Sequence, residues 1–565
     1  MDVSEILNTL LDNPKVAAIE LHNENTYIQT LQATYDCVMS CELSTIGKLV
    51  SVYIGIPKEW ELVLLDIYIR DYDSFPFIPH VEANGKLCLF DLEGVLIDTD
   101  LCGIINQCID RAIEILSDGL NGSNSEDFIN EFYSYWRNLP DNRIIKCVTP
   151  SDSTTQVIKY ADRSEKRREK ETVKVFKKRV RLSQLFAATD YDSFKIWNVN
   201  ETQKNGIYFY LQAKSYIYPP DGRSPLALEF INNLLCLISY DDCSRVMRKT
   251  SSEKMFIFQI LQPNGVDTYF GVLLKNCDCV EREGCFQIIE KDSMELYPLS
   301  VRRVDKSYLM GRISDTSLQP TQKCLLIGCG SIGGYLANEL TKAGLENITF
   351  VDDDKLIAEN VYRHFLGVEY VGQYKAGALA RYFEKNIPQT KIRAIDDSIQ
   401  NLYEDGSVDF NDFSLIISAT GNHNINRWLN KLFLYNRMNA PVIYVWNEPI
   451  DIGCHAAIIQ SRREGCYECF FQHNELTGDL YDTTAYCAPG QRITRVFAGC
   501  GGSFVPYGST TSLKSSALCM DLVRKALDGR CKDNILASMK GDGFHFVKQG
   551  LQVSDVFVNH GFSRQ

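Results

Sequence analysis

The second half of the chain alternates strand-like and helix-like segments, and this alternation constrains the fold more than any other feature. Apolar runs of strand length occur at "CLLIG", "ITFVD", "KIRAID", "LIISAT" and "PVIYVWN", and helical segments such as "GYLANELTKAG" lie between them. Strands that alternate with helices usually form a parallel sheet covered by helices on both faces. The sequence therefore predicts a doubly wound α/β domain, which we place at residues 316–565.

The start of the chain has a different pattern. Residues 1–150 contain extended segments ("KLVSVYIGIP", "WELVLLDIYIR"), a proline-rich turn "FPFIPH", and a helical segment from about Leu101 to Leu116. The two prolines cannot lie inside a helix and bias their neighbours towards extended backbone. We therefore expect a compact α+β domain here.

Between these domains we expect a linker and a mostly β middle domain. Residues 182–315 carry alternating apolar segments such as "KMFIFQILQ" and "DTYFGVLLKN", and they show no catalytic constellation, so we interpret them as a spacer. The linker, residues 151–181, ends in the basic run "RSEKRREKETVKVFKKRVR". Charge runs usually form solvated surface, and docking of a partner is the alternative.

Length and charge exclude several classes of protein. A chain of 565 residues exceeds one hydrophobic core, so the α/β multidomain organisation is expected. The net charge of -13 argues against broad nucleic-acid binding, which needs excess Lys and Arg. No apolar run is long enough for a membrane span, and the N-terminus "MDVSEILNTLLDNPKVAAIE" is acidic where a signal peptide would be basic. We expect a cytoplasmic protein whose twenty cysteines are mostly buried thiols.

The glycine-rich turn "GCGSIGG" predicts a nucleotide site. It places Gly328, Gly330 and Gly333 directly after a strand and at the start of a helix, where the backbone can approach phosphate groups closely. Asp352 and Asp354 follow the second strand, where an acid can accept hydrogen bonds from ribose hydroxyls. To this point an NAD-dependent oxidoreductase and an ATP-dependent enzyme fit equally well.

The next segment favours ATP. Asn360, Arg363 and Lys375 follow the acids within a short stretch and supply an amide and two cations. An oxidoreductase has no evident use for two cations there, whereas attack on an α-phosphate builds charge on phosphate oxygens that cations stabilise. Surface basic residues without a ligand are the alternative interpretation.

The motifs "GCGSIGG", Asp352, "NVYR" and Lys375, in this order, resemble the adenylation domain of the E1-like activating enzymes, which include the ubiquitin activators and the bacterial sulfur-carrier activators. The resemblance implies a Rossmann-like fold and the use of ATP and Mg2+ to adenylate the C-terminal carboxylate of a small protein, which a cysteine then takes as a thioester. One motif departs from the family: Gly421 and Asn422 stand where an aspartate commonly helps to hold magnesium. Asn422 or a carboxylate among residues 352–354 would have to hold the magnesium in place of this aspartate.

Two cysteines compete for the first thioester. Cys500 in "FAGCGGSFVPYG" resembles the crossover-loop cysteine of noncanonical activating enzymes, which also precedes a proline and a helix rich in small residues. Cys487 in "AYCAPGQRITR" is the rival, with Arg492 and Arg495 nearby to favour its thiolate. We prefer Cys500.

A C-x-x-C motif raises the question of zinc. Cys466 and Cys469 in "GCYECFFQ" have the spacing of half a structural zinc site, but no second C-x-x-C occurs in the sequence. Zinc and a pair of plain thiols both remain open.

The N-terminal segment "FPFIPHVEANGKLCLFD" resembles the active-site segment of conjugating (E2-like) enzymes, which makes Cys88 the candidate acceptor of the thioester. The His-Pro-Asn tripeptide of that family is missing, because Val81 follows His80. Asn84 could support the oxyanion instead, and a buried structural cysteine is the alternative interpretation.

A conjugating domain followed by an activating domain resembles the fused bacterial E1–E2 enzymes encoded beside cyclic-oligonucleotide synthases (CD-NTases) in anti-phage (CBASS) operons. The resemblance implies a CD-NTase C-terminus as substrate, a target lysine or other amine as acceptor, and a homodimer. The alternatives are a sulfur-carrier activator of the MoeB and ThiF kind, an NAD-dependent oxidoreductase, and a non-catalytic scaffold.

Overall fold

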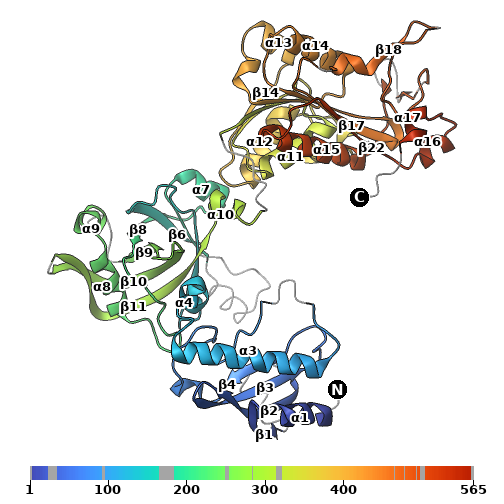
Figure 1. Ribbon diagram of the computed structural model, residues 1–565. Coiled ribbons are helices and arrows are strands. Elements are labelled where there is room, and N and C mark those ends of the chain that lie inside the picture. Colours follow the sequence, from blue (N-terminus) through green and yellow to red (C-terminus); the bar gives the residue numbers. More distant parts are fainter. Residues whose placement is uncertain are drawn as a thin grey trace, which may run out of the picture. The chain divides into compact units, whose positions relative to one another are not determined.

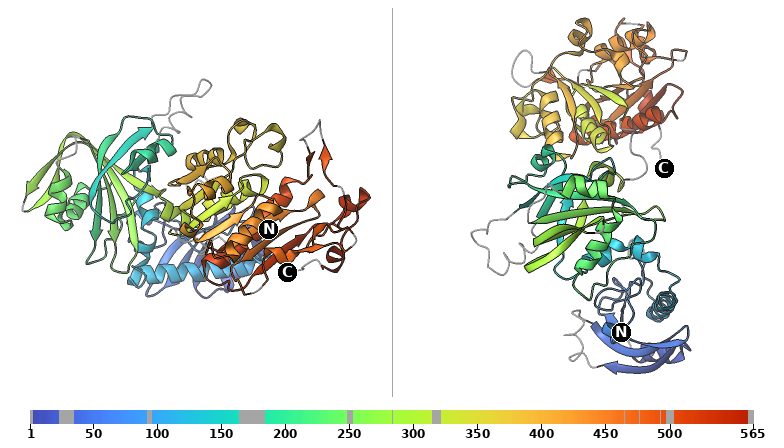
Figure 2. Two further views of the ribbon diagram at one scale, coloured as in Figure 1. Left: turned by 90° about the horizontal axis from the view of Figure 1, so that it is seen from above. Right: turned by 90° about the vertical axis from the view of Figure 1, so that its left-hand side faces the viewer.

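The chain forms two compact units, Met1–Val304 and Asp305–Gln565 (Figure 1, Figure 2). The computed structural model describes residues 3–22, 35–91, 96–163, 184–247, 253–282, 284–313, 321–463, 465–475, 477–491, 493–496 and 503–560. Within these ranges, no helix is both long and apolar enough to cross a bilayer.

The first unit begins with an antiparallel sheet covered by a long helix. The sheet has strands in sequence order, β1 (Val16–His22), β2 (Tyr35–Thr45), β3 (Lys48–Pro57) and β4 (Asp66–Ile69). The helices beside it are α1 (Val3–Asp12) and α3 (Leu101–Asn121). α3 starts after Asp100, whose carboxylate accepts the N–H of Gly103, and it buries Ile105, Ile109 and Leu116 against the sheet. The predicted α+β pattern and the helix from Leu101 are confirmed.

A closed seven-stranded barrel follows within the same unit, with strand order β10-β11-β5-β7-β6-β8-β9. Its strands are β5 (Arg143–Cys147), β6 (Gln156–Arg163), β7 (Gln184–Ala188), β8 (Lys204–Gln212), β9 (Lys254–Leu261), β10 (Asp267–Arg282) and β11 (Cys285–Arg303). The accompanying helices are α4 (Asp127–Asn130), α5 (Phe132–Arg137), α7 (Tyr191–Ile196), α8 (Leu228–Leu237) and α9 (Tyr240–Met247). The side chains of the barrel strands alternate between two apolar clusters. One cluster also contains residues of α5, α8 and α9, and the second consists of the residues that lie between them along the strands.

The barrel starts earlier in the chain than the sequence pattern indicates. β5 and β6 both precede residue 182, and β6 lies in the segment that we expected to be a linker. Tyr160 and Ala161 of β6 are buried although charged residues surround them in the sequence, which hides the strand from a pattern search. Most of the basic run, residues 164–181, lies outside the described residues.

One pair of cysteines in this unit is joined. Cys236 of α8 and Cys285 of β11 form a disulfide, although the cysteines were expected to be mostly buried thiols. The other described cysteines take part in no disulfide.

The second unit contains a seven-stranded sheet with the order β14-β13-β12-β15-β16-β17-β22. Its strands are β12 (Lys323–Ile327), β13 (Asn347–Val351), β14 (Ile392–Ile395), β15 (Leu415–Ser418), β16 (Val442–Asn447), β17 (Gly453–Ile459) and β22 (Ile535–Lys540). The first five are parallel, and β17 and β22 add an antiparallel edge. Two short hairpins lie outside the sheet, β18 (Phe471–His473) with β19 (Leu480–Asp482), and β20 (Arg495–Val496) with β21 (Ser503–Phe504).

Helices cover both faces of this sheet, which confirms the predicted doubly wound fold. The helices are α10 (Lys306–Met310), α11 (Ser331–Lys342), α12 (Lys375–Asn386), α13 (Ile399–Glu404), α14 (His423–Leu434), α15 (Ser509–Leu527), α16 (Phe544–Lys548) and α17 (Asp555–Asn559). α11, α12 and α15 pack with Cys324 and Leu326 of β12. α13 and α14 pack with Leu325 and Ile327, which point to the opposite face because side chains alternate along a strand.

The strand order creates a switch point beside β12. After β12 the chain adds β13 and β14 on one side and then returns to place β15 on the other side. The connections after β12 and β15 therefore leave in opposite directions and open a crevice at the carboxyl ends of the strands. Open α/β sheets usually bind ligands in such a crevice.

Candidate active site

A cavity of about 430 Å³ lies at this switch point. Most residues predicted to bind the nucleotide line it together: Gly328, Gly330, Asp352, Asp354, Asn360, Arg363, Lys375 and Asn422. They come from the segments that follow β12, β13 and β15, and from the start of α12. The structure thus brings together side chains that are up to about a hundred residues apart in the sequence.

The glycine turn is built from backbone in close contact. Gly328 has a φ of 87°, in the left-handed region, and a Cβ at this position would lie 2.8 Å from the nitrogen of Thr420. A Cβ on Gly333 would lie 1.9 Å from the oxygen of Gly328. By contrast, a Cβ on Gly330 would meet no atom within 4 Å, so this glycine leaves open space in the cavity.

Gly333 differs from the other two glycines of the motif in its position. Gly328 and Gly330 line the cavity, whereas Gly333 is not among the described residues that line it. The missing Cβ of Gly333 lets α11 lie directly against the turn, and Ser331 and Ile332 of its first turn line the cavity. The N–H groups at the start of a helix form a favourable site for an anion.

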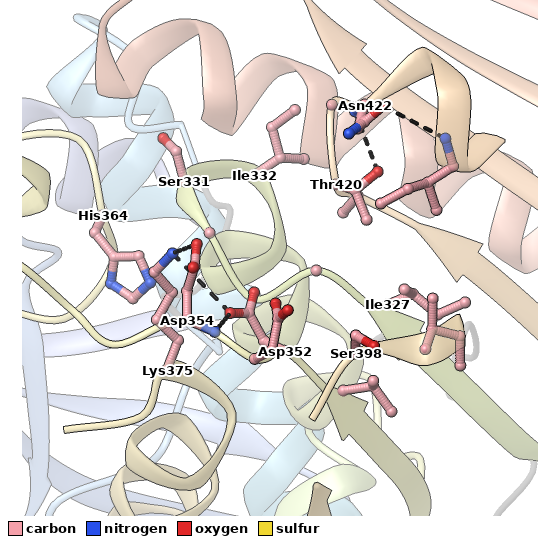
Figure 3. Close-up of a pocket in the computed structure, with 18 of the residues that line it drawn as sticks. Ile327, Ser331, Ile332, Asp352, Asp354, His364, Lys375, Ser398, Thr420 and Asn422 are labelled. Atoms are coloured by element: carbon pink, nitrogen blue, oxygen red, sulfur yellow. Dashed lines mark hydrogen bonds and ion pairs between the residues drawn. The ribbon is translucent and has the colours of Figure 1, made fainter. Parts of the chain in front are cut away.

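An acid–lysine cluster forms one side of the cavity, and Figure 3 shows it around Lys375. The Lys375 ammonium lies 2.7 Å from Asp354 Oδ2 and 4.0 Å from Asp352 Oδ1. Both carboxylate oxygens of Asp352 accept backbone N–H groups, from Cys329 at 2.6 Å and from Asp354 at 2.9 Å. Burial raises the pKa of Asp352, although Lys375 and these two N–H groups lower it in part. Asp352 thus joins the glycine turn to the end of β13.

The cations differ in exposure. The Lys375 side chain is 10% exposed, and its ammonium points at the acids from the first residue of α12. Arg363 is half-buried, and its guanidinium carbon lies 5.4 Å from the centre of the Tyr507 ring. Its carbonyl accepts a hydrogen bond of 2.6 Å from the hydroxyl of Ser331, the residue after Gly330. This bond fixes the Arg363 segment against the glycine turn.

Several residues of the cavity were missed in the sequence analysis: Ser331, His364, Asp397, Ser398 and Tyr507. His364 is buried, and its Nε2–H donates to the carbonyl of Cys329, because its Nδ1 accepts the N–H of Leu366. Burial lowers the pKa of His364, so the imidazole is neutral and braces the turn. Ser331 lies inside the quoted motif, so the motif itself could have indicated it.

Asn422 lines the cavity on the side opposite Lys375, as Figure 3 shows. Its side-chain oxygen caps α14 by accepting the N–H groups of Asn424 at 2.9 Å and Ile425 at 3.4 Å. This amide oxygen is therefore already engaged with the helix. Carboxylates that also line the cavity are those of Asp353, Asp354 and Asp397.

A second cavity of about 1270 Å³ adjoins the first. Asn360, Arg363 and Tyr507 line both. The larger cavity also carries Arg495, Lys514, Lys540 and His545. A ligand in the larger cavity can therefore reach the contents of the smaller one beside Arg363.

Cys487 is held tightly by its surroundings. Its N–H donates to Glu448 Oε2 at 2.8 Å, and the other oxygen of Glu448 lies 2.7 Å from Nε2 of the buried His455. The thiol contacts the carbonyl of Ala488 and the amide of Gln491. Burial and the charge of Glu448 raise the pKa of Cys487 to about 11. Its rival Cys500 lies outside the described residues, as does Arg492.

The C-x-x-C motif forms a close pair of thiols. The sulfur atoms of Cys466 and Cys469 lie 3.8 Å apart, and the N–H of Cys466 donates to the sulfur of Cys469. Among the described residues, no group of three or more His, Cys, Asp or Glu side chains could hold a metal ion. A structural zinc needs four ligands, so the donor set does not support the zinc prediction.

Cys88 is exposed and lies eight residues after His80 in the first unit. Its N–H donates to the carbonyl of His80 at 2.8 Å. Although the side chain is exposed, desolvation of the sulfur and the negative charges of Glu82 and Glu131 raise the pKa of Cys88 to about 11. Asn84 uses its side-chain oxygen to accept the N–H of Lys86 at 3.1 Å.

Two family models match separate parts of the chain. The ThiF family matches residues 311–538, which contain the cavity and its glycine turn. Prokaryotic E2 family B matches residues 17–145, which contain Cys88. These matches confirm the predicted domain types at both ends of the chain.

Two of the similar proteins have the name of a ubiquitin transferase-like protein. An ATP-dependent ubiquitin transferase-like protein Cap2 from Pseudomonas aeruginosa is 24% identical over 478 residues, which cover 80% of each chain. A Cap2 protein from Escherichia coli is 25% identical over 41% of this chain and 40% of its own length. A crystal structure of Escherichia coli MccB with MccA-N7isoASN matches 42% of this chain and 67% of its own at 17% identity, with a TM-score of 0.30. The chain is an E1/E2-like transferase, with its E2-family segment before its ThiF-family segment.

Proposed function

We propose that this E1/E2-like enzyme activates the C-terminal carboxylate of a partner protein with ATP and transfers the acyl group to an amine of a target protein. The acyl group is carried as a thioester, first on Cys500 and then on Cys88. A ThiF-family domain and an E2-family domain in one chain support both halves of this reaction.

The observation that carries the proposal is the pair of adjoining cavities. The smaller cavity has the glycine turn and Lys375 for a nucleotide, and the larger one can take the end of a polypeptide. Because Arg363 lines both, a carboxylate that arrives through the larger cavity meets the α-phosphate beside a cation. A carboxylate oxygen attacks the α-phosphorus and pyrophosphate leaves, while Arg363 and Lys375 stabilise the charge on the phosphate oxygens.

The residues of the smaller cavity fit ATP bound with magnesium. Gly330 leaves room for phosphate groups, and the first turn of α11, where helix N–H groups favour an anion, also lines the cavity. Asp353, Asp354 and Asp397 supply carboxylates, and Mg2+ usually binds through one or two carboxylates together with substrate phosphates. The metal would neutralise phosphate charge when bound. Asp352 keeps its predicted ribose role in this proposal, with its oxygens already oriented by two N–H groups.

The surroundings of Cys487 favour Cys500 as the first nucleophile. The first nucleophile must reach the adenylate, whereas the backbone of Cys487 is held by Glu448 and its thiol contacts Ala488 and Gln491. The Cys500 thiolate attacks the acyl carbon and AMP leaves. The Cys88 thiolate then attacks the thioester and the Cys500 thiolate leaves.

The charge around Cys88 suits an amine as the final acceptor. The carboxylates of Glu82 and Glu131 create a negative field that attracts a lysine ammonium. After loss of a proton to solvent, the amine attacks the thioester and the Cys88 thiolate leaves.

We propose the C-terminus of the CD-NTase as the substrate, a homodimer as the assembly, and the cytoplasm, where ATP is available, as the location. The first point follows from the resemblance found in the sequence, and the relatives named ATP-dependent ubiquitin transferase-like proteins agree with the transfer of a protein's acyl group. In one chain or across a dimer, linkage of the two cysteines gives a high effective concentration for transfer.

Non-reducing electrophoresis tests the proposal. The purified protein is mixed with ATP, Mg2+ and the CD-NTase that we propose as its substrate, and we expect a thiol-sensitive adduct that Cys500→Ala abolishes. Cys88→Ala should keep the first adduct and stop transfer to the target amine. Loss of the first adduct only in Cys487→Ala would contradict the assignment of the first cysteine, and normal turnover of Cys88→Ala would indicate a sulfur-carrier activator instead.

A further inference from the structure

The segment that leads to Cys88 is held by residues of the barrel side of the first unit. This segment, residues 72–80, contains the proline-rich turn and ends at His80. Two separate groups of contacts fix it, one made by Arg223 and one made by α4 and α5. The sequence analysis interpreted the barrel as a spacer, and these contacts point to a further role.

Arg223 forms the first contact. It lies in the connection between β8 and α8 of the barrel, and its Nη1 donates to the carbonyls of Tyr72 at 2.6 Å and Phe75 at 2.7 Å. The carboxylate of Asp221 holds the other side of the guanidinium, and the guanidinium carbon lies 4.6 Å from the centre of the Tyr72 ring. The Arg223 side chain is 17% exposed. Arginine presents its donors in a rigid fork, so this contact fixes the direction of the backbone.

His80 forms the second contact. Its Nδ1 lies 2.9 Å from Glu131 Oε1 and its Nε2 lies 2.9 Å from Asp127 Oδ2. Ionised carboxylates only accept hydrogen bonds, so both ring nitrogens carry protons and the ring is an imidazolium held between two acids. The hydrogen bond to Glu131 is the largest of the effects that raise the pKa of His80, in agreement with this geometry.

The backbone of His80 connects this contact to Cys88. His80 has a φ of 60°, in the left-handed region that residues other than glycine rarely adopt. Its N–H donates to the hydroxyl of Tyr135 at 2.7 Å, and its carbonyl accepts the N–H of Cys88 at 2.8 Å. The Tyr135 hydroxyl in turn donates to Glu131 at 2.9 Å. The position of Cys88 therefore depends on how His80 is held.

The helices that hold His80 are anchored in the barrel. Phe132 and Trp136 of α5 are buried with Phe270 of β10, at ring distances of 5.1 and 4.3 Å. The Trp136 indole N–H donates to the carbonyl of Leu299 in β11 at 3.1 Å. One face of this helical segment thus belongs to the barrel core, and the other face carries Glu131 and Tyr135 to His80.

We propose that the barrel is part of the Cys88 site: His80, held between Asp127 and Glu131, and Arg223, bound to the carbonyls of Tyr72 and Phe75, are positioning residues for thioester transfer to Cys88. This inference rests on the proposed function, since it assigns residues to the second transfer step. These contacts from the barrel side support the Cys88 segment in place of the missing tripeptide.

The test uses Arg223→Met and His80→Gln in the full chain. Arg245→Met is the matched control, because Arg245 also donates to a barrel carbonyl, that of Thr155 at 2.9 Å, without contact to the Cys88 segment. The CD-NTase with ATP and Mg2+ serves as the substrate. Single-turnover transfer to Cys88 and ATP–pyrophosphate exchange are measured, and alkylation of Cys88 by N-ethylmaleimide at pH 8 is followed by mass spectrometry of its peptide.

We expect transfer to Cys88 to fall about tenfold to a hundredfold in both variants, because misplacement of a reacting group costs rate of this order. Pyrophosphate exchange should stay at the level of Arg245→Met. Alkylation of Cys88 should rise about tenfold, since release of the segment hydrates the sulfur, and a pKa lower by one unit gives tenfold more thiolate.

Transfer rates equal to those of Arg245→Met would overturn the inference. If the unaltered protein forms no thioester on Cys88, the proposed function fails, and the alkylation rates alone then test the structural role of His80 and Arg223. Faster alkylation of Cys88 in both variants supports this role. Alkylation rates equal to that of Arg245→Met overturn it. Near-ultraviolet circular dichroism checks the packing of Trp136. His80→Gln lies outside the barrel core, so it keeps the test decisive if Arg223→Met does not fold.

Discussion

Replacement of Lys375 by methionine should lower both the stability of the second unit and its rate of ATP–pyrophosphate exchange. The side chain keeps its length, but the charge that faces Asp352 and Asp354 is lost. A pair of unit charges 4.0 Å apart, as for Lys375 and Asp352, interacts by about 4 kcal/mol at an effective dielectric constant of about 20. Water that enters the cavity compensates part of this loss, and Asp354 is exposed and adds little. We therefore expect a loss of about 2 kcal/mol.

The loss should depend on pH, because the pKa of Asp352 is raised by burial and lowered by Lys375. Without the lysine this pKa rises further. A carboxyl group whose folded-state pKa is raised favours the folded state at low pH, and this contribution is lost as pH rises through the folded-state pKa. The stability deficit of Lys375→Met is thus small near pH 4 and largest above the raised pKa.

Thermal unfolding and pyrophosphate exchange measure the two effects. At pH 8 the melting temperature of the second unit should fall by about 4–8 °C, and the fall should be smaller at pH 5. Exchange should fall about a hundredfold or more, since a cation beside the phosphates is lost. The matched control is Lys355→Met. Lys355 is exposed, lies on the connection from β13 to α12 that ends at Lys375, and is not among the described residues that line the cavity. Equal deficits at both pH values, or exchange like that of the control, would refute the reasoning.

Three further predictions follow from other contacts. Gly333→Ala should lower the stability of the second unit by about 2–4 kcal/mol, since its Cβ would overlap the turn, whereas Gly330→Ala should leave the melting temperature unchanged and raise the KM for ATP. His80→Gln should destabilise the first unit most near pH 6, and the difference from the unaltered chain should shrink as pH rises through the raised pKa of His80, above about 6.5, in melting curves from pH 6 to 9. Metal analysis by mass spectrometry should find well below one zinc per chain, and Cys466→Ser with Cys469→Ser should not change the melting temperature by more than about 2 °C.

The fold of the second unit could be predicted because its parallel strands are short apolar runs between helices. Each run from "CLLIG" to "PVIYVWN" corresponds to a strand from β12 to β16. β22 was not predicted, because its antiparallel pairing with β17 joins residues about eighty positions apart. β17 was not predicted either, although it pairs with the preceding strand β16. The barrel strand β6 was missed since its alternating pattern lies among charged residues.

The candidate site was predictable where a local motif sets the geometry. The glycine turn and the acids after β13 line one cavity, as their positions at strand ends indicate. The contacts of His80 could not be predicted, because they depend on side chains about fifty residues away in a helical segment whose other face is fixed by the barrel. The role of Asn422 could have been predicted but was overlooked. An asparagine directly before a helix usually caps it, and Asn422 caps α14.

The position of β5 limits where genes of this kind can recombine. β5 pairs with β11 on one side and β7 on the other, although it precedes both by many residues in the sequence. In a hybrid gene with a junction near residue 150, β5, α4 and α5 would come from one parent. The other barrel strands and Arg223 would come from the other parent, so their contacts would join residues of different origin. A crossover near residue 305 would separate the two compact units and leave both cores intact. Exchange of activating domains between relatives should therefore succeed at the later boundary, whereas exchange of conjugating domains requires the barrel to move with them.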